Sequence, residues 1–209
     1  MNNLDHIFQS ADTSRDYAHE YLQYLSKVLK LVDRDEITNF IDIMLDARAR
    51  NAAIIFIGNG GSAATASHFA NDLAIGTRCE GQPFRAISLT DNNAVMTAIA
   101  NDDGYEQVFL QQLKTVMLAG DIVVAISASG NSPNLLNAIQ YANDTGATTI
   151  GLTAFDGGAL KNLAKHNVHI PTETGEYGPA EDAHMILDHL VSSYLMRLVK
   201  VQTEKGQGA

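Results

Sequence analysis

The sequence is short of cysteine and of long apolar runs, and both shortages exclude classes of protein. Its 209 residues include one cysteine, Cys79, so no disulfide can form within the chain. No apolar run approaches the roughly 20 residues that span a bilayer, and residues 1–16 are polar, without the apolar core of a signal peptide. We therefore expect a cytoplasmic protein that makes no membrane contact.

Basic residues are also scarce. Lysine and arginine number 14 against 24 aspartate and glutamate residues, which gives a formal net charge of −10. Such a surface repels phosphate backbones, so we expect no nucleic-acid partner. A small anion is still a candidate ligand, but the glycine- and serine-rich loops described below contain no lysine or arginine. Backbone dipoles and hydroxyl groups would have to hold it.

Internal repeats and low-complexity linkers are absent too, which favours a single domain long enough to bury a large core. We divide the chain into an N-terminal helical extension of that domain (1–50), a main body (51–200) and a flexible tail (201–209). Apolar residues at helical spacing predict two amphipathic helices in the extension, the second opened by an N-cap at Asp33 with Glu36 in the capping-box position. The two helices either complete the core or form contacts between subunits.

The main body alternates short apolar runs with helical patterns. Strands that are buried on both faces read as continuous apolar runs, so the alternation predicts an α/β fold with a doubly wound parallel sheet flanked by helices. Ligands of such sheets bind beyond the carboxyl ends of the strands. The expected strands are 53–57, 84–89, 121–127, 148–153 and 168–170. The expected helices are 62–75, 92–99, 105–118, 133–143, 160–164 and 181–200.

The first expected strand ends in a glycine-rich loop that opens a helix. The loop consists of Gly58, Asn59, Gly60, Gly61 and Ser62. Its glycines allow a sharp turn and the close approach of a ligand, and the helix start offers free N–H groups to an anion. A plain tight turn is one alternative. A dinucleotide site is another, because Gly58, Gly60 and Ala63 satisfy a relaxed G-x-G-x-x-A fingerprint. Asp91, after the second strand, would then bind the ribose, and this loop alone does not decide between the three.

The third expected strand ends in a serine-rich loop, again before a helix. The loop consists of Ser127, Ala128, Ser129, Gly130, Asn131 and Ser132. Three hydroxyls and a glycine at a helix start suit a phosphate monoester, because hydroxyls and backbone amides can satisfy its oxygens without a lysine. A dinucleotide fold needs no such second site. The alternative is a run of cap and turn residues, but two such loops after two different strands favour phosphate binding.

Two of the expected helices carry side chains that can bind a metal or move protons. His68 and Asp72, four residues apart, share one face of the helix after the first loop. For this pair alone, a surface ion pair is the preferred interpretation. The last helix is mostly apolar, so charges buried in it would need partners or a metal, unless its polar end reaches solvent. Spacing alone groups Glu181, His184 and Asp188 on one stripe. The ionisable residues of this helix are Glu181, Asp182, His184, Asp188 and His189.

These motifs together resemble the sugar isomerase (SIS) domain family. The two loops, His68 and the pair Asn101 and Asp102 agree with it in order and spacing, over about residues 32–199. They are most similar to the members that convert D-sedoheptulose 7-phosphate to D-glycero-D-manno-heptose 7-phosphate. The resemblance implies the SIS fold, a flavodoxin-like five-stranded parallel sheet, and an aldose–ketose isomerase that works by enediol proton transfer. It also implies a place in the first steps of nucleotide-activated heptose synthesis for surface polysaccharide, as in lipopolysaccharide biosynthesis.

The resemblance also assigns roles to residues. It implies one Zn²⁺ per subunit bound by His68, Asp72, Glu181 and His189, with Asp72 as base and His189 as general acid/base. It implies substrate contacts from Asn59, Gly60, Gly61, Ser62, Asp72, Asn101, Asp102, Ser127, Ala128, Ser129, Ser132 and Glu181. The family base is usually glutamate, one methylene longer than Asp72, and Glu181 stands where glutamine is usual. Two imidazoles and two carboxylates still suit zinc.

The resemblance selects His189 over His184 and leaves open whether His184 and Asp188 take part. Glu181 and His189 would lie about 12 Å apart along a straight helix. Their convergence on one ion requires Glu181 to precede the helix, or a neighbouring subunit to contribute ligands. The resemblance implies a homotetramer with active sites at subunit interfaces, and the apolar stripes of the N-terminal and last helices agree with that assembly.

Two other functions compete with the isomerase. Some SIS-domain proteins have no catalytic role and bind a protein partner, such as a replication initiator. The last-helix histidine, His189, and the intact Gly60 and Gly61 argue against that function here. The serine-rich loop argues against the remaining hypothesis, an NAD-dependent enzyme.

Overall fold

Five parallel strands form the centre of the fold in the computed structural model, which describes residues 1–79 and 81–206, with side chains up to residue 202. The strands are β1 (Ala53–Gly58), β2 (Arg85–Ser88), β3 (Ile122–Ser127), β4 (Thr148–Ala154) and β5 (His166–Ile170). Their order is β2-β1-β3-β4-β5, and every neighbouring pair is parallel. This confirms the predicted doubly wound, flavodoxin-like sheet.

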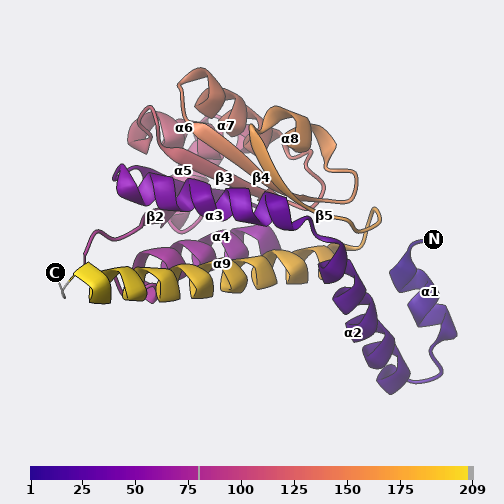
Figure 1. The fold of residues 1–209 in the computed structure, drawn as a ribbon. Helices are drawn as coiled ribbons and strands as arrows, with labels where there is room; N and C mark the ends of the chain where they lie inside the picture. The colour runs from indigo at the N-terminus through magenta and orange to yellow at the C-terminus, as the bar shows by residue number, and fades with distance from the viewer. Residues whose placement is uncertain (80, 207–209) are drawn as a thin grey trace.

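Helices cover both faces of the sheet (Figure 1). One face carries α3 (Arg34–Ala49), α4 (Gly61–Asn71) with the π-helical turn that extends it (Asp72–Gly76), and α9 (Tyr177–Gly206). The other face carries α5 (Asn93–Asp102), a 3₁₀ turn (Tyr105–Gln107) leading into α6 (Val108–Val116), α7 (Pro133–Asp144) and α8 (Gly158–Leu163).

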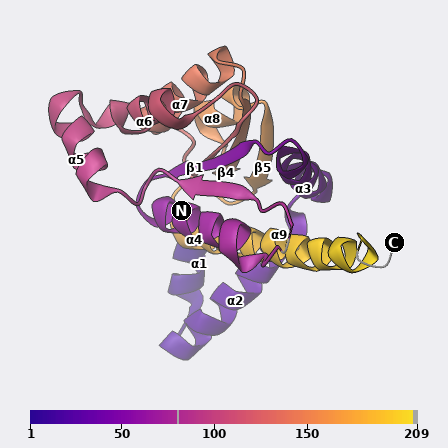
Figure 2. The ribbon, with the colours of Figure 1, turned by 90° about the vertical axis from the view of Figure 1, so that its left-hand side faces the viewer.

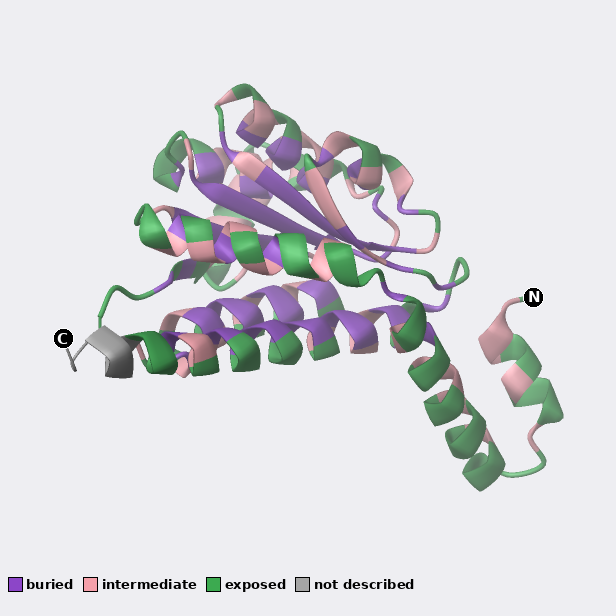
Figure 3. Ribbon diagram, in the orientation of Figure 1, coloured by how far each residue is buried: buried purple, intermediate pink, exposed green. Residues whose placement is uncertain are grey.

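Successive side chains along each strand point to opposite faces of the sheet, so a separate hydrophobic core forms on each face. Ile54 and Phe56 of β1 point towards α3, α4 and α9, where Phe56 stacks on Phe69 with ring centroids 4.9 Å apart. Ile55 and Ile57 point towards α6 and α7. All four β1 side chains are buried, and the three central strands β1, β3 and β4 are buried along most of their length (Figure 3). The continuous apolar run of β1 therefore has a physical reason, since helices cover both of its faces.

Three helices precede the sheet, where the sequence predicted two. The prediction missed α1 (Asn3–Ser10), because this short helix buries no residue and so offers little apolar pattern. It begins at a capping box between Asn2 and Asp5. The following α2 (Ser14–Leu31) buries only Val28. The hairpin of α1 and α2 projects from the body of the molecule (Figures 1 and 3).

Polar contacts tie this extension to the body. The Tyr24 O–H donates to the buried Glu176, just before α9. Asp33 caps α3 as predicted. Glu36 instead reaches the sheet, because its Oε2 accepts from the His169 N–H at 2.8 Å and so joins α3 to β5.

The last helix, α9, lies alongside α4 (Figure 2). Its apolar residues Leu187, Val191 and Leu195 are buried. It runs on to Gly206 and does not end near Lys200 as predicted, and residues 207–209 of the expected tail lie outside the described residues. Across residues 1–79 and 81–206, no helix combines the length and apolar character that crossing a membrane requires.

Candidate functional site

The two loops meet at the point where the sheet reverses its winding. β1 and β3 are neighbours, yet β1 leads into α4 on one face of the sheet and β3 into α7 on the other. Ligands of doubly wound sheets bind at such a switch point, beyond the carboxyl ends of the strands. Residues 58–62 and 127–132 follow these two strands, so the fold brings together the loops that the sequence singled out.

A cleft of about 240 Å³ opens beside these loops. Asn59 of the first loop exchanges two hydrogen bonds with Asn134 of α7, with Nδ2–Oδ1 distances of 3.0 and 2.8 Å. The Tyr105 O–H donates to Asn59 Oδ1 at 2.9 Å. Ser132 and Glu106 line the same cleft. Sequence analysis did not identify Asn134 or Tyr105, because neither lies within a motif.

The serine loop (residues 127–132) is held by its own hydroxyls and by the loop after β4. Ser127 Oγ accepts from the Gly130 N–H at 3.1 Å, and the Gly130 carbonyl accepts from the Leu160 N–H at 2.9 Å. Gly130 has a φ of +64°, and a Cβ there would lie 2.0 Å from the Gly157 carbonyl oxygen, so only glycine fits. Ser132 is the N-cap of α7 but makes no side-chain capping bond. Pro133 at the start of α7 has no N–H, and the Leu135 and Leu136 N–H groups bond to the Ser132 carbonyl. The Ser132 hydroxyl and the Asn134 N–H are therefore the groups placed to bind an anion.

The other residues expected to contact substrate differ in their surroundings. Ser62 and Ala128 are buried within the two loops, and Gly60 adopts a φ of +54° at the start of α4. Asn101 and Asp102 are exposed at the end of α5, where Asn101 Nδ2 donates to Asp102 Oδ1 at 2.7 Å. Among the described residues, no hydrogen bond joins this pair to either loop.

A second group of functional side chains lies between α4 and α9. His68 and Asp72 come from α4 and its π-helical extension, and Asp188 and His189 come from α9. One possible ligand atom from each lies within 4.8 Å of all the others. His68 Nε2 is 3.1 Å from His189 Nε2, 3.6 Å from Asp72 Oδ2 and 3.9 Å from Asp188 Oδ2. The fold thus brings the predicted pair His68 and Asp72 to the predicted His189.

This donor set fits a divalent metal ion. Two histidine nitrogens 3.1 Å apart are close to the separation of about 3.3 Å that tetrahedral bonds of about 2.0–2.1 Å produce. Asp188 is fully buried, and neither of its oxygens has a hydrogen-bond partner among the described residues. Burial raises the pKa of the Asp188 carboxyl group to about 8, and the charge of Asp72 adds to the rise. A cation among the four side chains would satisfy the buried oxygens and favour their ionised form.

Glu181, which the resemblance placed among the ligands, is not in this group of the single chain. It lies within α9 rather than before it, so one of the two conditions for its convergence with His189 is not met. Its carboxylate rests on the first loop, since a Cβ added to Gly61 would lie 2.3 Å from Glu181 Oε2. Asp188, which spacing had grouped with Glu181, lies next to His68 instead.

His184 packs against the sheet and does not join the group. It is fully buried, and its Nε2 lies 3.4 Å from the Thr153 carbonyl oxygen on β4. Its Nδ1 has no partner within the described part of the chain. Burial lowers the pKa of His184 to about 4, so the imidazole is neutral at pH 7.

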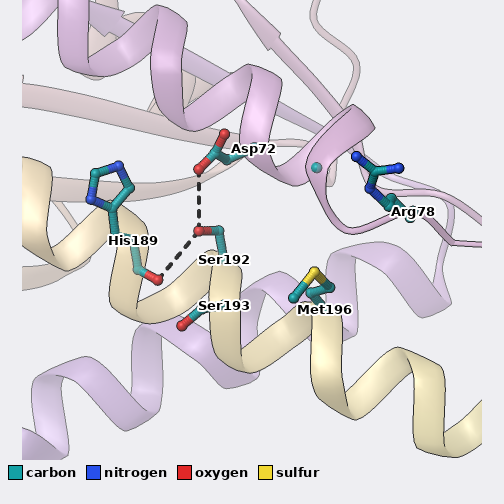
Figure 4. Close-up of a pocket in the computed structure, with 7 residues that line it drawn as sticks. Asp72, Arg78, His189, Ser192, Ser193 and Met196 are labelled. Carbon is teal, nitrogen blue, oxygen red and sulfur yellow. Dashed lines mark hydrogen bonds between the residues drawn. The ribbon is translucent and has the colours of Figure 1, made fainter.

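A cavity of about 400 Å³ lies beside the metal-binding group (Figure 4). Asp72 and His189 line it, and the Ser192 hydroxyl donates to Asp72 Oδ2 at 3.4 Å. Arg78 lies on the opposite side from His189. Sequence analysis did not identify this positive charge, because it lies outside both loops. The full lining is Asp72, Gly76, Arg78, His189, Ser192, Ser193 and Met196, none of which lines the cleft at the switch point.

Comparisons with known proteins agree with this architecture. The SIS domain family model matches residues 16–154. The phosphoheptose isomerase of Aliarcobacter butzleri is 33% identical over 174 residues, which cover 82% of this chain and 91% of that protein. A solved phosphoheptose isomerase structure from Francisella tularensis superposes with a TM-score of 0.80 at 26% identity, covering 88% of this chain and 99% of the other. One from Neisseria gonorrhoeae gives a TM-score of 0.79 at 28% identity, covering 88% and 98%.

Proposed function

The chain belongs to the SIS domain family and, within it, to the phosphoheptose isomerases, and from this premise we propose that it interconverts D-sedoheptulose 7-phosphate and D-glycero-D-manno-heptose 7-phosphate. The observation that carries the proposal is the meeting of Asp72 and His189 on one cavity. An aldose–ketose isomerase needs one group that moves a proton between two carbons and another that moves a proton between two oxygens. A carboxylate and an imidazole provide that pair.

The phosphate of the substrate belongs in the serine loop. Ser127, Ser129 and Ser132 supply hydroxyls there, and Asn134 at the start of α7 supplies a backbone N–H. The position at the switch point supports this assignment. The loop contains no lysine, so its hydroxyls and backbone amides would have to satisfy the phosphate oxygens. The remaining substrate contacts that we propose come from Asn59, Gly60, Gly61, Ser62, Ala128, Asn101, Asp102, Asp72 and Glu181.

The chemical step is a pair of proton transfers. Asp72 takes a proton from C1 of the open-chain ketose and returns it to C2 of the resulting enediol. His189 moves the second proton, from the C1 oxygen to the C2 oxygen. Asn71 Nδ2 at 3.1 Å and Ser192 Oγ at 3.4 Å donate to the two Asp72 oxygens and orient the carboxylate. Zinc is the ion that we propose for the His68, Asp72 and His189 group, and when bound it supplies Lewis-acid polarisation of the sugar oxygens.

The first loop, which the two Asn59–Asn134 hydrogen bonds join to the start of α7 next to the serine loop, lies far from Asp72 in one chain. Asp72 follows Gly61 by eleven residues at the far end of α4, a rise of about 16 Å. An extended seven-carbon sugar phosphate has eight bonds between C1 and phosphorus and spans about 10 Å, at the spacing of an extended chain. This mismatch favours an active site that combines the serine loop of one chain with the Asp72 and His189 cavity of a neighbour.

A homotetramer with shared sites is the assembly that we propose. The projecting α1–α2 hairpin exposes Phe8 and Leu22, and α9 exposes Leu190 and Tyr194 close to His189. Such side chains on unpaired helix faces suit contacts between subunits. The cytoplasmic location expected from the single cysteine stays a prediction.

An isomerisation assay across ketose phosphates of different chain length tests the function. We expect turnover of sedoheptulose 7-phosphate, and a fall in kcat of about 10²- to 10⁴-fold in Asp72→Asn, because this change removes the base. Asp42→Asn is the matched control, since Asp42 is an exposed aspartate of α3 away from both sites. Wild-type protein that turns over no ketose phosphate, with or without added zinc, refutes the proposal.

A further inference from the structure

Asp188 is a fully buried acidic side chain on the apolar face of α9. Its neighbours Leu187 and Val191 on α9 are buried, and Asp188 itself has no exposed surface. Neither carboxylate oxygen accepts a hydrogen bond from any described residue. An ionised carboxylate in such a place requires a cation or a donor. The one basic side chain with a nitrogen within 4.0 Å of Asp188 among the described residues is His68, at 3.9 Å.

Glu181 lies two helical turns before Asp188 on α9, where its contact with Gly61 holds it. Asp188 follows Glu181 by seven residues, which corresponds to about 10 Å along α9. Glu181 rests on Gly61, which lies the same seven residues before His68 on α4. The two helices therefore lie side by side with matching residue spacing. Gly61 contacts Glu181, and seven residues further along each helix His68 lies next to Asp188. Because α9 is continuous from Tyr177 to Gly206, no break in the helix brings Glu181 closer.

We propose that Asp188, rather than Glu181, supplies the second carboxylate ligand, so that His68, Asp72, Asp188 and His189 of a single chain form a complete metal site. The inference rests on the metal ion of the proposed function. Two ionised aspartates balance the charge of a divalent cation, and two neutral imidazoles complete a four-ligand set of the kind that zinc accepts. Glu181 then stays at the first loop, where it is not required for metal binding.

Zinc affinity separates the two carboxylates. Full-length apoprotein is titrated with zinc against a chromophoric chelator, for the wild type and for the Asp188→Asn and Glu181→Gln variants, which are matched acid-to-amide changes on the same helix. Loss of a residue that only orients a metal ligand costs about 10- to 100-fold in affinity, so loss of a ligand should cost at least tenfold. We expect this loss in Asp188→Asn and a change of less than about threefold in Glu181→Gln.

Thermal unfolding shows whether each variant is folded. Asn has nearly the shape of Asp and carries no charge, so metal-free Asp188→Asn should unfold at a temperature no lower than metal-free wild type. Zinc stabilises only a folded state that binds it. Added zinc should therefore raise the Tm of the wild type and of Glu181→Gln, and raise that of Asp188→Asn much less.

The outcomes distinguish this inference from the proposed function. If Glu181→Gln loses zinc as strongly as Asp188→Asn or more strongly, the assignment of Asp188 is overturned while the metal of the proposed function stands. If Asp188→Asn binds zinc as tightly as the wild type, the assignment is likewise overturned. If the wild type binds no zinc at all, both the assignment and the proposed zinc fall, and the isomerase assay decides the function separately.

Discussion

A methyl group on Gly130 should damage the serine loop while leaving the Asp72 and His189 cavity intact. Gly130 has a φ of +64°, and a Cβ there would lie 2.0 Å from the Gly157 carbonyl oxygen. Real Cβ contacts do not fall below 3.0 Å, so the serine loop and the loop after β4 would have to separate by about 1 Å. This separation would also disturb the hydrogen bond from the Leu160 N–H to the Gly130 carbonyl.

Two terms set the expected cost of Gly130→Ala in the free energy of unfolding. The left-handed backbone conformation costs an alanine about 1–2 kcal/mol, and the overpacking against Gly157 adds about 1–3 kcal/mol. The sum is about 2–5 kcal/mol. If the loop binds the phosphate, a misplacement of about 1 Å should also lower kcat/KM for the sugar phosphate by about 100-fold.

Gly146→Ala is the matched control. Gly146 has a φ of +88°, but a Cβ there meets only the Ala119 side chain, at 3.8 Å. Gly146 also lies just after α7, at the end of that helix opposite the serine loop. The control should therefore lose only the conformational term of about 1–2 kcal/mol and keep wild-type kinetics.

Urea unfolding and steady-state kinetics measure the two effects on the same samples. Equal destabilisation of the two variants would refute the close approach of Gly130 to Gly157. Destabilised Gly130→Ala with wild-type kcat/KM, measured where the protein is still folded, would refute the assignment of the phosphate to this loop.

Three further predictions address the loop, the buried histidine and the assembly. Ser129→Ala should raise KM for the sugar phosphate about 10- to 150-fold, since a hydrogen bond to a charged group contributes about 1.5–3 kcal/mol; an equal rise for a non-phosphorylated sugar contradicts the phosphate role. Burial lowers the pKa of His184 from its ordinary value of 6.5 to about 4 in the folded chain, so the folded state binds fewer protons than the unfolded state at acid pH. The stability present above pH 6.5 should therefore fall by about 3 kcal/mol as the pH drops to 4. His184→Gln should reduce this loss of stability when the free energy of unfolding is measured by urea unfolding between pH 7 and 4. An unchanged loss in the variant excludes His184 as its source. Mixing Asp72→Asn subunits with Gly130→Ala subunits should restore part of the activity, and inactive mixed assemblies would exclude a shared site.

The sheet and its two loops were predictable because local chemistry determines them. A continuous apolar run such as Ile54 to Ile57 is stable only between two covering layers. Glycines and hydroxyls at the carboxyl ends of β1 and β3 gather at one edge in any parallel sheet, whatever the details of packing. The same reasoning placed Asp33 at a helix start, because an N-cap depends only on neighbouring residues.

Contacts between helices were not predictable in the same way. The sequence left both Glu181 and Asp188 as possible partners for His68. Which of them lies beside His68 depends on the position of α9 along the axis of α4. The contact of Glu181 with Gly61 sets that position, and no local pattern in either helix specifies it. Asn134 and Tyr105 were missed for a related reason, since their bonds to Asn59 join segments more than 40 residues apart.

Metal binding and catalysis should depend on assembly to different degrees. His68, Asp72, Asp188 and His189 meet within one chain, so the inferred metal site requires only the packing of α4 on α9. The serine loop lies at the switch point beside the first loop, and Gly61 of the first loop is about 16 Å from Asp72 along α4. A substrate of about 10 Å would reach from the serine loop to Asp72 most readily across subunits. Dissociated subunits would then keep their zinc and lose their turnover, because separation removes the phosphate site from the cavity without disturbing the four ligands.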